Sequence, residues 1–162
     1  MTGQTSINNN AHVSDAGPGP YVKRLNAITA SVTMDKSYDD QTVVINAAAG
    51  LTCTLPTSDG GGAKYRFVIG TTVTSNTVVI KVNNTTDSII GFSNIISDDA
   101  GGPAKGFIAA ANSDDTVTFN GTTTGGYIGD YVEITDLAAG TFHVRVFGKA
   151  TGTEATPFSA TV

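Results

Sequence analysis

Alternating apolar and polar residues in the last third of the chain constrain its fold more than any other feature. Two segments, 131–137 and 141–147, show this alternation on either side of the turn signal Ala138-Ala139-Gly140. A period of two places the apolar side chains of a strand on one face and its polar side chains on the other. The segments are therefore predicted to form a β-hairpin. Its core-facing residues are Val132, Ile134, Phe142, Val144 and Val146.

The need for one shared core face also predicts a register for this hairpin. Centring the turn on Ala138 places the apolar residues of both segments on the same side. In this register Glu133 faces His143, and Tyr131 faces Arg145, on the outer face. A cross-strand pair of a carboxylate and an imidazole contributes at most about 1 kcal/mol. The Glu133–His143 pair is therefore a test of the register.

Short strand patterns continue through the chain from about Asn26, separated by turn signals rich in Gly, Asn and Asp. About ten short strands at this spacing are typical of an antiparallel β-sandwich or barrel. The helix-like stretch 46–49 ends at Gly50 and is too short for a stable helix, so almost no helix is expected. We predict an all-β fold in which residues 26–162 form a single β domain. The strands expected outside the hairpin are 27–34, 41–46, 51–55, 64–69, 77–82, 87–96, 105–111, 115–120 and 157–162.

A second pairing is suggested by segments 64–69 and 77–82, which a Thr-rich loop connects. If they pair, Tyr65, Phe67 and Ile69 face the same core as Val78, Ile80 and Val82. Lys64, Arg66 and Lys81 then share the outer face, either as solvated side chains or in contact with an acidic group.

Residues 1–25 differ from the rest of the chain. They contain a polar run at 6–10 and the breaker Gly17-Pro18-Gly19-Pro20, with almost no periodic apolar residues. Such a segment cannot bury enough apolar surface to offset its ordering entropy. It is expected to be a disordered tail or an extended N-terminal arm that becomes ordered on a neighbouring chain.

The composition excludes several classes of protein. The net charge of −5 argues against non-specific binding to nucleic acid, which needs clustered Lys and Arg. No run approaches the roughly 18 apolar residues of a membrane-spanning helix, and the N-terminus lacks a signal-peptide pattern, so synthesis and retention in a cytoplasm are expected. A single cysteine, Cys53, excludes an internal disulfide. Its alternation with Leu51 and Leu55 favours a buried thiol, with a reactive or intermolecular role as the alternative.

The residues needed for catalysis are not combined in any known pattern. Of two histidines, His12 lies in the N-terminal segment and His143 lies in the middle of a predicted strand, where a surface histidine is the common reading. The run Gly60-Gly61-Gly62-Ala63-Lys64 has the glycines of a phosphate loop, but Tyr65 follows the lysine and a strand begins where a helix should. No catalytic residue, cofactor site or enzyme activity is predicted.

Three aspartate pairs are the remaining candidates for a site. Asp39-Asp40, Asp98-Asp99 and Asp114-Asp115 could supply oxygen ligands to Ca²⁺, but none shows the spacing of a calcium loop. Asp also forms turns through bonds from its side chain to the backbone. Turn formation is the favoured reading, a metal site is the alternative, and no metal-binding residue is assigned.

Two stretches resemble a known class of protein. One is residues 50–75, from Gly50-Leu51-Thr52-Cys53-Thr54-Leu55-Pro56 to Thr74-Ser75, and the other is residues 148–159. Both resemble small β-rich virion proteins of tailed bacteriophages, in particular capsid decoration (cement) proteins. The resemblance implies a trimer on the outer surface of a capsid, with the major capsid protein as partner and no catalytic residues. It also implies that the N-terminal arm contacts neighbouring subunits, and that the protein is located in the virion.

Two other functions remain open. Similar Gly- and Thr-rich sequences occur in phage head and tail fibres, so an adhesion module that binds host surface glycans is the alternative. Such a module needs aromatic side chains to stack on sugars, and this chain has no Trp and five Tyr. A polysaccharide depolymerase is the third possibility, and the absence of a long sequence repeat argues against it.

Overall fold

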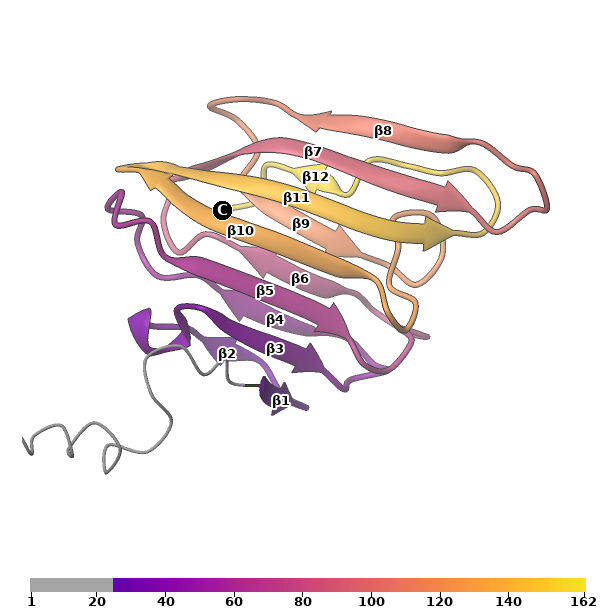
Figure 1. Cartoon of the computed structure of the whole chain (residues 1–162), viewed down its shortest axis with the longest axis horizontal. Helices are drawn as coiled ribbons and strands as arrows, with labels where there is room; N and C mark the ends of the chain where they lie inside the picture. Colours follow the sequence, from indigo (N-terminus) through magenta and orange to yellow (C-terminus); the bar gives the residue numbers. More distant parts are fainter. Residues whose placement is uncertain (1–24) are drawn as a thin grey trace, which may run out of the picture.

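Two β-sheets lie face to face in the computed structural model, which describes residues 25–162 (Figure 1). The arm predicted at residues 1–25 lies outside the described residues, except Leu25, which begins the first strand. One short 3-10 helix, η1 (Lys36–Tyr38), is the only helix in residues 25–162, which confirms the expected scarcity of helix. The strands are β1 (Leu25–Ile28), β2 (Val32–Thr33), β3 (Gln41–Ile45), β4 (Leu51–Thr54), β5 (Lys64–Ile69), β6 (Val78–Lys81), β7 (Ser88–Ser97), β8 (Ala104–Ala109), β9 (Thr116–Phe119), β10 (Tyr131–Ala138), β11 (Thr141–Ala150) and β12 (Phe158–Ser159).

Seven strands form the larger sheet, in the order β1-β3-β5-β10-β11-β7-β8, and five form the smaller one, in the order β12-β9-β6-β4-β2. The all-β sandwich is therefore confirmed. The expectation of purely antiparallel sheets is wrong, because both sheets are mixed. The parallel pairs are β1–β3, β3–β5, β7–β11, β2–β4 and β4–β6.

These parallel pairs arise because the first six strands alternate between the two sheets. β1, β3 and β5 lie side by side in the larger sheet, and β2, β4 and β6 lie side by side in the smaller one. The chain therefore winds between the sheets as a short coil. The pairing suggested between 64–69 and 77–82 is wrong, since β5 and β6 belong to different sheets. The single strand predicted at 27–34 is likewise two strands, β1 and β2, in different sheets.

The core lies between the sheets and is filled by the alternate residues of their strands. Tyr65, Phe67 and Ile69 of β5 share this core with Val78 and Ile80 of β6 and with Val82, as predicted. Strands in opposite sheets can share a core without being paired. The predicted core-facing residues are therefore confirmed although the predicted pairing is wrong. The largest fully buried side chains include Tyr65, Phe67, Phe119 and Phe142.

Cys53 lies within this core. Its side chain is inaccessible to solvent, and burial raises the pKa of its thiol to about 12. The predicted buried thiol is confirmed. The neutral thiol is the form present at neutral pH, and it behaves as a small apolar side chain.

The hairpin of β10 and β11 forms as predicted, and all five predicted core-facing residues are buried. The predicted register is wrong. Glu133 faces Arg145 instead of His143, Tyr131 faces Phe147, and Thr135 faces His143. Leu137 is an extra residue on β10, and Gly140 takes a positive φ of 82° in the turn. This bulged turn moves the pairing by two residues, which keeps every side chain on its predicted face.

One glycine is required for the larger sheet to stay continuous. Gly91, in the middle of β7, has a φ of 140°, and a Cβ atom added there would lie 1.9 Å from the carbonyl oxygen of Val144 on β11. Only glycine permits this close approach of two backbones. The residue therefore lets β7 pair with β11.

Candidate binding surface

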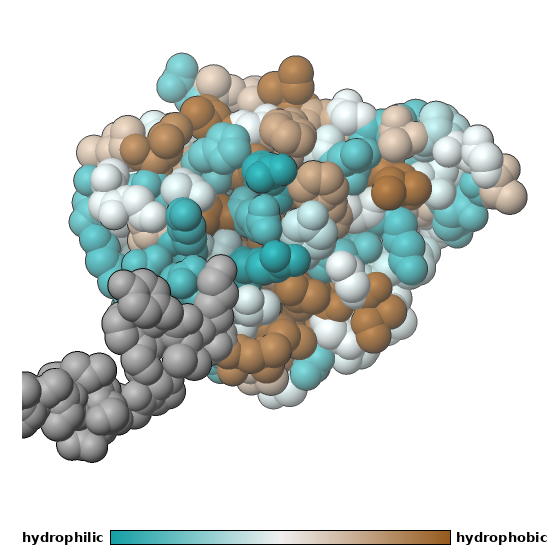
Figure 2. Space-filling view, viewed as in Figure 1, coloured by the Kyte–Doolittle hydropathy of each residue, from teal (hydrophilic) through white to brown (hydrophobic). Residues whose placement is uncertain are grey.

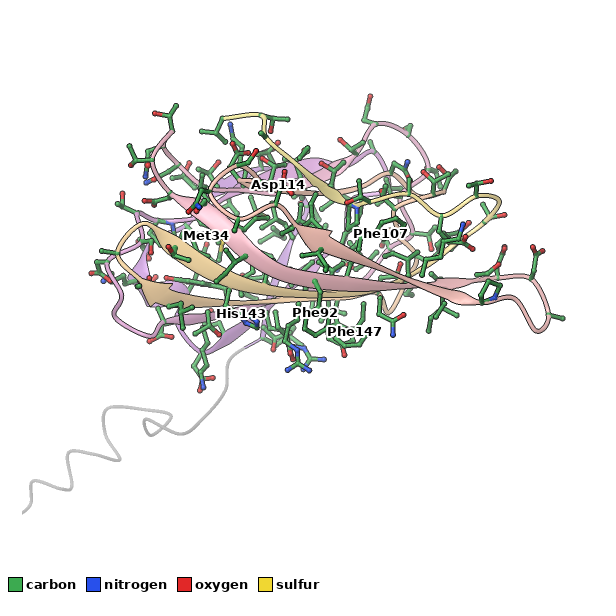
Figure 3. All side chains as sticks on the ribbon, turned by 90° about the horizontal axis from the view of Figure 1, so that it is seen from above. Met34, Phe92, Phe107, Asp114, His143 and Phe147 are labelled. Carbon is green, nitrogen blue, oxygen red and sulfur yellow. The ribbon has the colours of Figure 1, made fainter. Side chains whose placement is uncertain are left out.

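The outer face of the larger sheet brings together charged and aromatic residues from three neighbouring strands. Arg66 of β5 faces Glu133 of β10, which in turn faces Arg145 of β11. In the adjacent cross-strand row, Tyr131 faces Phe147. Figure 3 shows Phe147, His143 and Phe92 on this side of the sheet.

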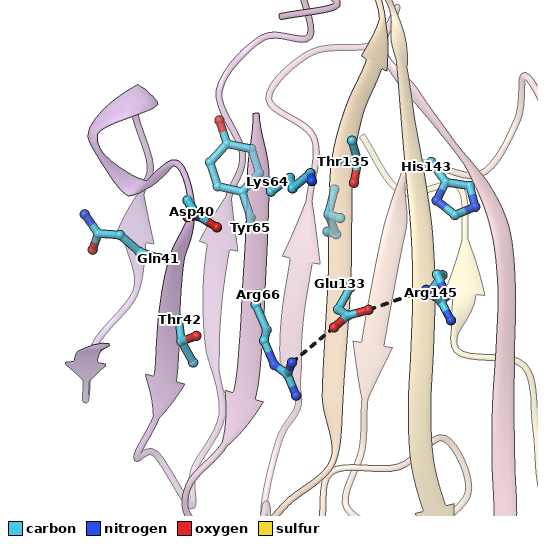
Figure 4. A pocket seen from close by; sticks show the side chains of 11 residues that line it. Asp40, Gln41, Thr42, Lys64, Tyr65, Arg66, Glu133, Thr135, His143 and Arg145 are labelled. Carbon is cyan, nitrogen blue, oxygen red and sulfur yellow. Dashed lines mark hydrogen bonds and ion pairs between the residues drawn. The ribbon is translucent and has the colours of Figure 1, made fainter. Parts of the chain in front are cut away.

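Five of these side chains form a closed set of contacts. Arg66 Nη1 lies 3.1 Å from Glu133 Oε1, and Arg145 Nη1 lies 3.8 Å from Glu133 Oε2 (Figure 4). The guanidinium carbon of Arg66 lies 4.7 Å from the centre of the Tyr131 ring. That ring is stacked on Phe147, with 5.0 Å between the ring centres and 19° between the planes. The guanidinium carbon of Arg145 lies 5.9 Å from the centre of the Phe147 ring. We call Arg66, Tyr131, Glu133, Arg145 and Phe147 the guanidinium–aromatic cluster.

The cluster orders side chains that would otherwise be mobile. An isolated surface ion pair or cation–π contact contributes at most about 1 kcal/mol. Here each guanidinium has both a carboxylate and an aromatic ring beside it. The two contacts of each arginine therefore restrict the same side-chain rotamers. Together the contacts restrict the positions of the Arg66 and Arg145 guanidiniums on this platform.

A depression of about 340 Å³ adjoins this platform. It extends from the charged row toward Lys64, Thr135 and His143, which form the next cross-strand row (Figure 4). Its lining residues are Asp40, Gln41, Thr42, Lys64, Tyr65, Arg66, Glu133, Ile134, Thr135, His143 and Arg145. Three cations therefore line the depression with two carboxylates.

The sign of charge distinguishes this face from the rest of the described chain. The outward positions of its strands carry Lys64, Arg66, Arg145 and Lys149, with Glu133 as the only carboxylate among them. Lys149 lies over Tyr127, 5.1 Å from the ring centre. The other Asp and Glu residues of the described chain lie in turns and loops, except Asp136, which is buried. A protein with a net charge of −5 thus presents one basic sheet face.

Exposed apolar residues lie on the same sheet beside the charged rows. Phe92 and Ile96 of β7 and Ile108 of β8 have exposed fractions of 43%, 51% and 83%. Phe92 faces Arg145 on one side and Ile108 on the other, so it continues the charged row toward the β8 edge. Figure 2 shows hydrophilic residues in the centre of this face with hydrophobic residues in separate groups around them.

Positions that the sequence singled out are distributed as follows. Tyr131, Glu133, His143 and Arg145 all lie on the predicted outer face, but with the partners described above. Lys81 does not share a face with Lys64 and Arg66, because it lies in the smaller sheet. The acidic contact considered for these cations exists for Arg66, with Glu133. His12 lies outside the described residues.

The glycine-rich run 60–64 leads directly into β5, so no helix terminus faces it. Its loop is anchored by the buried Asp136, which accepts hydrogen bonds from Gly60 N at 2.9 Å and from Ser58 Oγ at 2.7 Å. These bonds are structural. They hold the loop before β5 against the bulged end of β10.

Residues of two of the three aspartate pairs, Asp39-Asp40 and Asp114-Asp115, accept hydrogen bonds from the backbone. Asp39 accepts a hydrogen bond from Lys64 N at 2.8 Å, and Asp114 accepts one from Ala110 N at 2.7 Å. Asp115 accepts hydrogen bonds from Thr161 N at 2.9 Å and from Val162 N at 3.2 Å. These bonds hold residues 161–162 against the start of β9. Among residues 25–162, no group of three or more His, Cys, Asp and Glu residues is arranged to hold a metal ion.

Sequence reasoning missed the guanidinium–aromatic cluster as a unit. The outward positions of its residues were predictable from alternation. The contacts between Tyr131 and Phe147 and between Arg66 and Glu133 required the pairing of β5 with β10 and the bulge of the hairpin. No local signal in the sequence specifies either of these.

The described part of the chain contains no helix long and apolar enough to cross a membrane. Comparisons with models of protein families, with curated proteins and with solved structures gave no match for this chain.

Proposed function

We propose that this protein is a structural virion protein that binds the outer surface of a phage capsid and stabilises the shell. The observation that carries the proposal is the basic, aromatic face of the larger sheet, flanked by exposed Phe92, Ile96 and Ile108. Interfaces between proteins are enriched in aromatic residues and arginine at their centres. The resemblance of residues 50–75 and 148–159 to capsid decoration proteins supports the same proposal.

In this proposal the protein acts as a homotrimer with the major capsid protein as its partner. Many weak contacts, repeated by the symmetry of the shell, supply the binding energy. The N-terminal segment 1–25 contacts neighbouring subunits. No catalysis, cofactor or nucleic acid is involved.

The alternative, an adhesion module for host glycans, is less well supported by the two stacked rings of this face, Tyr131 and Phe147. A sugar stacks on a free ring face. Arg66 and Phe147 come from strands on opposite sides of β10, so they cover the two faces of the Tyr131 ring. Phe147 in turn has Tyr131 on one face and Arg145 near it.

Purified protein added to capsids that lack it tests the proposal. We expect saturable binding, and decorated capsids should resist higher temperature and stronger osmotic shock than bare ones. Light scattering after size-exclusion chromatography should give the mass of a trimer. A protein that stays monomeric and never binds capsids would contradict the proposal, and a glycan array or a cell-adsorption assay would then test the alternative. Deletion of residues 1–24 should lower capsid occupancy while the β domain stays folded.

A further inference from the structure

We propose that the guanidinium–aromatic cluster is the docking site for an acidic segment of the shell protein. The inference rests on the proposed function and adds to it the face that is used and the chemistry of the partner. It assigns the contact to the outer face of the larger sheet and to carboxylate groups of the partner.

The cluster has hydrogen-bond donors to spare. A guanidinium carries five N–H donors in a rigid fork. In Arg66 and in Arg145 the terminal nitrogen Nη1 is the atom next to Glu133. The remaining N–H groups of both residues can bind a carboxylate from a partner, and such bidentate pairs are among the stronger hydrogen bonds in proteins.

The same contacts lower the entropic cost of binding. Ordering a long side chain at an interface costs about 0.5–1.5 kcal/mol. Glu133 and the stacked rings already restrict both arginines, so part of this ordering is present before the partner binds. Lys64 lies in the adjacent row, and in the described part of the chain it belongs to no ion pair. It adds a third cation to this face, in a depression that Asp40 also lines.

The charge distribution favours a compact acidic protein segment over a long polyanion. At about 0.1 M salt, charges interact over roughly 10 Å, so a short segment on this face experiences the three cations Lys64, Arg66 and Arg145 together with the two carboxylates Asp40 and Glu133, which leaves an excess of one positive charge. An extended polyanion such as DNA would also pass the acidic loops of a chain with net charge −5. The exposed Phe92 and Ile108 beside Arg145 suit the apolar residues of a protein partner.

Capsid binding by charge-neutralised variants tests the proposal. The double variant R66Q/R145Q removes both guanidiniums without placing a new carboxylate beside Glu133. We expect it to bind capsids at least about 30-fold more weakly than the wild type, as for the loss of a central arginine pair at an interface. The matched control K81Q removes a cation from the outer face of the smaller sheet and should change capsid affinity less than twofold.

A second variant separates charge from geometry. R66K/R145K keeps both positive charges but loses the planar fork, and we expect affinity to fall about threefold to tenfold. Thermal unfolding of each variant shows whether it is folded at the temperature of the assay. Unchanged capsid binding by folded R66Q/R145Q, or an equal loss in K81Q, would overturn the inference and leave the proposed function intact.

A peptide assay tests, without capsids, whether the guanidinium–aromatic cluster binds carboxylates. An immobilised poly-glutamate peptide should bind the wild type, bind R66Q/R145Q at least tenfold more weakly, and release both as salt is raised. Single-stranded DNA at equal charge should bind no better than the peptide. No peptide binding by the wild type, or DNA binding that alone depends on Arg66 and Arg145, would contradict the inference. If wild-type protein does not bind capsids, the proposed function fails, and the peptide result still decides whether this face binds carboxylates.

Discussion

The two outer faces of the sandwich differ in chemistry although their strands share one core. The larger sheet presents long charged and aromatic side chains that contact one another, above all in the guanidinium–aromatic cluster. The smaller sheet presents mostly short hydroxyl side chains. One outer row is Thr33, Thr54, Lys81, Thr116 and Ser159, of which Thr116 is buried, and the other is Thr52, Val79 and Thr118.

The difference shows which positions are required for folding and which are free for another role. Threonine is β-branched and favours strands, so a threonine row satisfies the needs of a solvated face. Arginine, glutamate and exposed phenylalanine are not needed for that purpose. Their concentration on the larger sheet is the reason for placing the proposed binding surface there.

The largest effect is expected from breaking the larger sheet between β7 and β11. Gly91→Ala would place a Cβ atom 1.9 Å from the carbonyl oxygen of Val144, at a φ of 140°. We expect a loss of about 4 kcal/mol in the free energy of unfolding, measured in urea. Gly106→Ala in the neighbouring strand β8 is the control, because its Cβ would meet only the Ser93 carbonyl oxygen at an ordinary 3.6 Å. Equal losses in the two variants would show that the pairing of β7 with β11 does not require glycine at this close backbone contact.

Tyr131 and Phe147 should show an energetic coupling that a cross-strand pair on the outer face of the smaller sheet lacks. Tyr131→Ala and Phe147→Ala should each cost about 2 kcal/mol, since each removes a half-buried ring. A double-mutant cycle should give a coupling energy of about 1 kcal/mol. The corresponding cycle with Val79→Ala and Thr118→Ala, neighbours on the other face, should give a value near zero. An equally large coupling energy between Val79 and Thr118 would contradict the proposed difference between the two outer faces.

Two buried carboxylates, one next to a strand of each sheet, should change the free energy of unfolding with pH in opposite directions. Asp115 precedes β9, and although burial opposes it, hydrogen bonds from Thr116 Oγ1 and from Thr161 N and Val162 N lower its pKa. Its stabilisation is present above its unfolded pKa of about 3.9 and is lost as the pH falls through its lower folded pKa. Asp115→Asn should cost about 1–2 kcal/mol at pH 7 and less at pH 3.

Asp130, which precedes β10, has its pKa raised by burial, despite hydrogen bonds from Tyr127 N and Gly126 N. Its folded pKa lies above the unfolded value, so its contribution is most favourable at low pH and declines as the pH rises through the folded pKa. The stability difference between wild type and Asp130→Asn should therefore shrink from pH 3 to pH 7. Urea unfolding at pH 3, 5 and 7 measures both trends, and slopes of the same sign for Asp115 and Asp130 would contradict this prediction.

The smallest effects are expected on the hydroxyl face. Thr52→Val and Thr118→Val keep the branched shape and remove a hydroxyl from a half-exposed position, so the free energy of unfolding should change by less than about 0.5 kcal/mol. Capsid binding should also stay unchanged. A loss of capsid binding in either variant would move the binding surface to the smaller sheet.

Strand positions were largely predictable from the sequence, because each strand has its own apolar alternation and its own turn signals. The segments 41–46, 51–55 and 64–69 correspond closely to β3, β4 and β5. Their partners were not predictable. A Thr-rich loop between two strands is compatible with a hairpin or with a crossing to the opposite sheet, and β5 to β6 is a crossing.

The proposed binding surface was predictable only in part for the same reason. Alternation placed Glu133, Arg145 and Tyr131 outward, but a bulge at Leu137 shifts the hairpin register by two residues. A shift of two preserves the face and changes every partner. Glu133 therefore meets two arginines, and Tyr131 meets Phe147.

The sequence by itself determined the strand content of this protein, the burial of Cys53 and the inward or outward direction of each hairpin side chain. These properties follow from local periodicity, which every strand carries on its own. Only the tertiary structure decided which strands are neighbours and which outward side chains touch. Those contacts join residues as far apart in the sequence as Arg66 and Glu133, so they depend on how the chain passes between the two sheets.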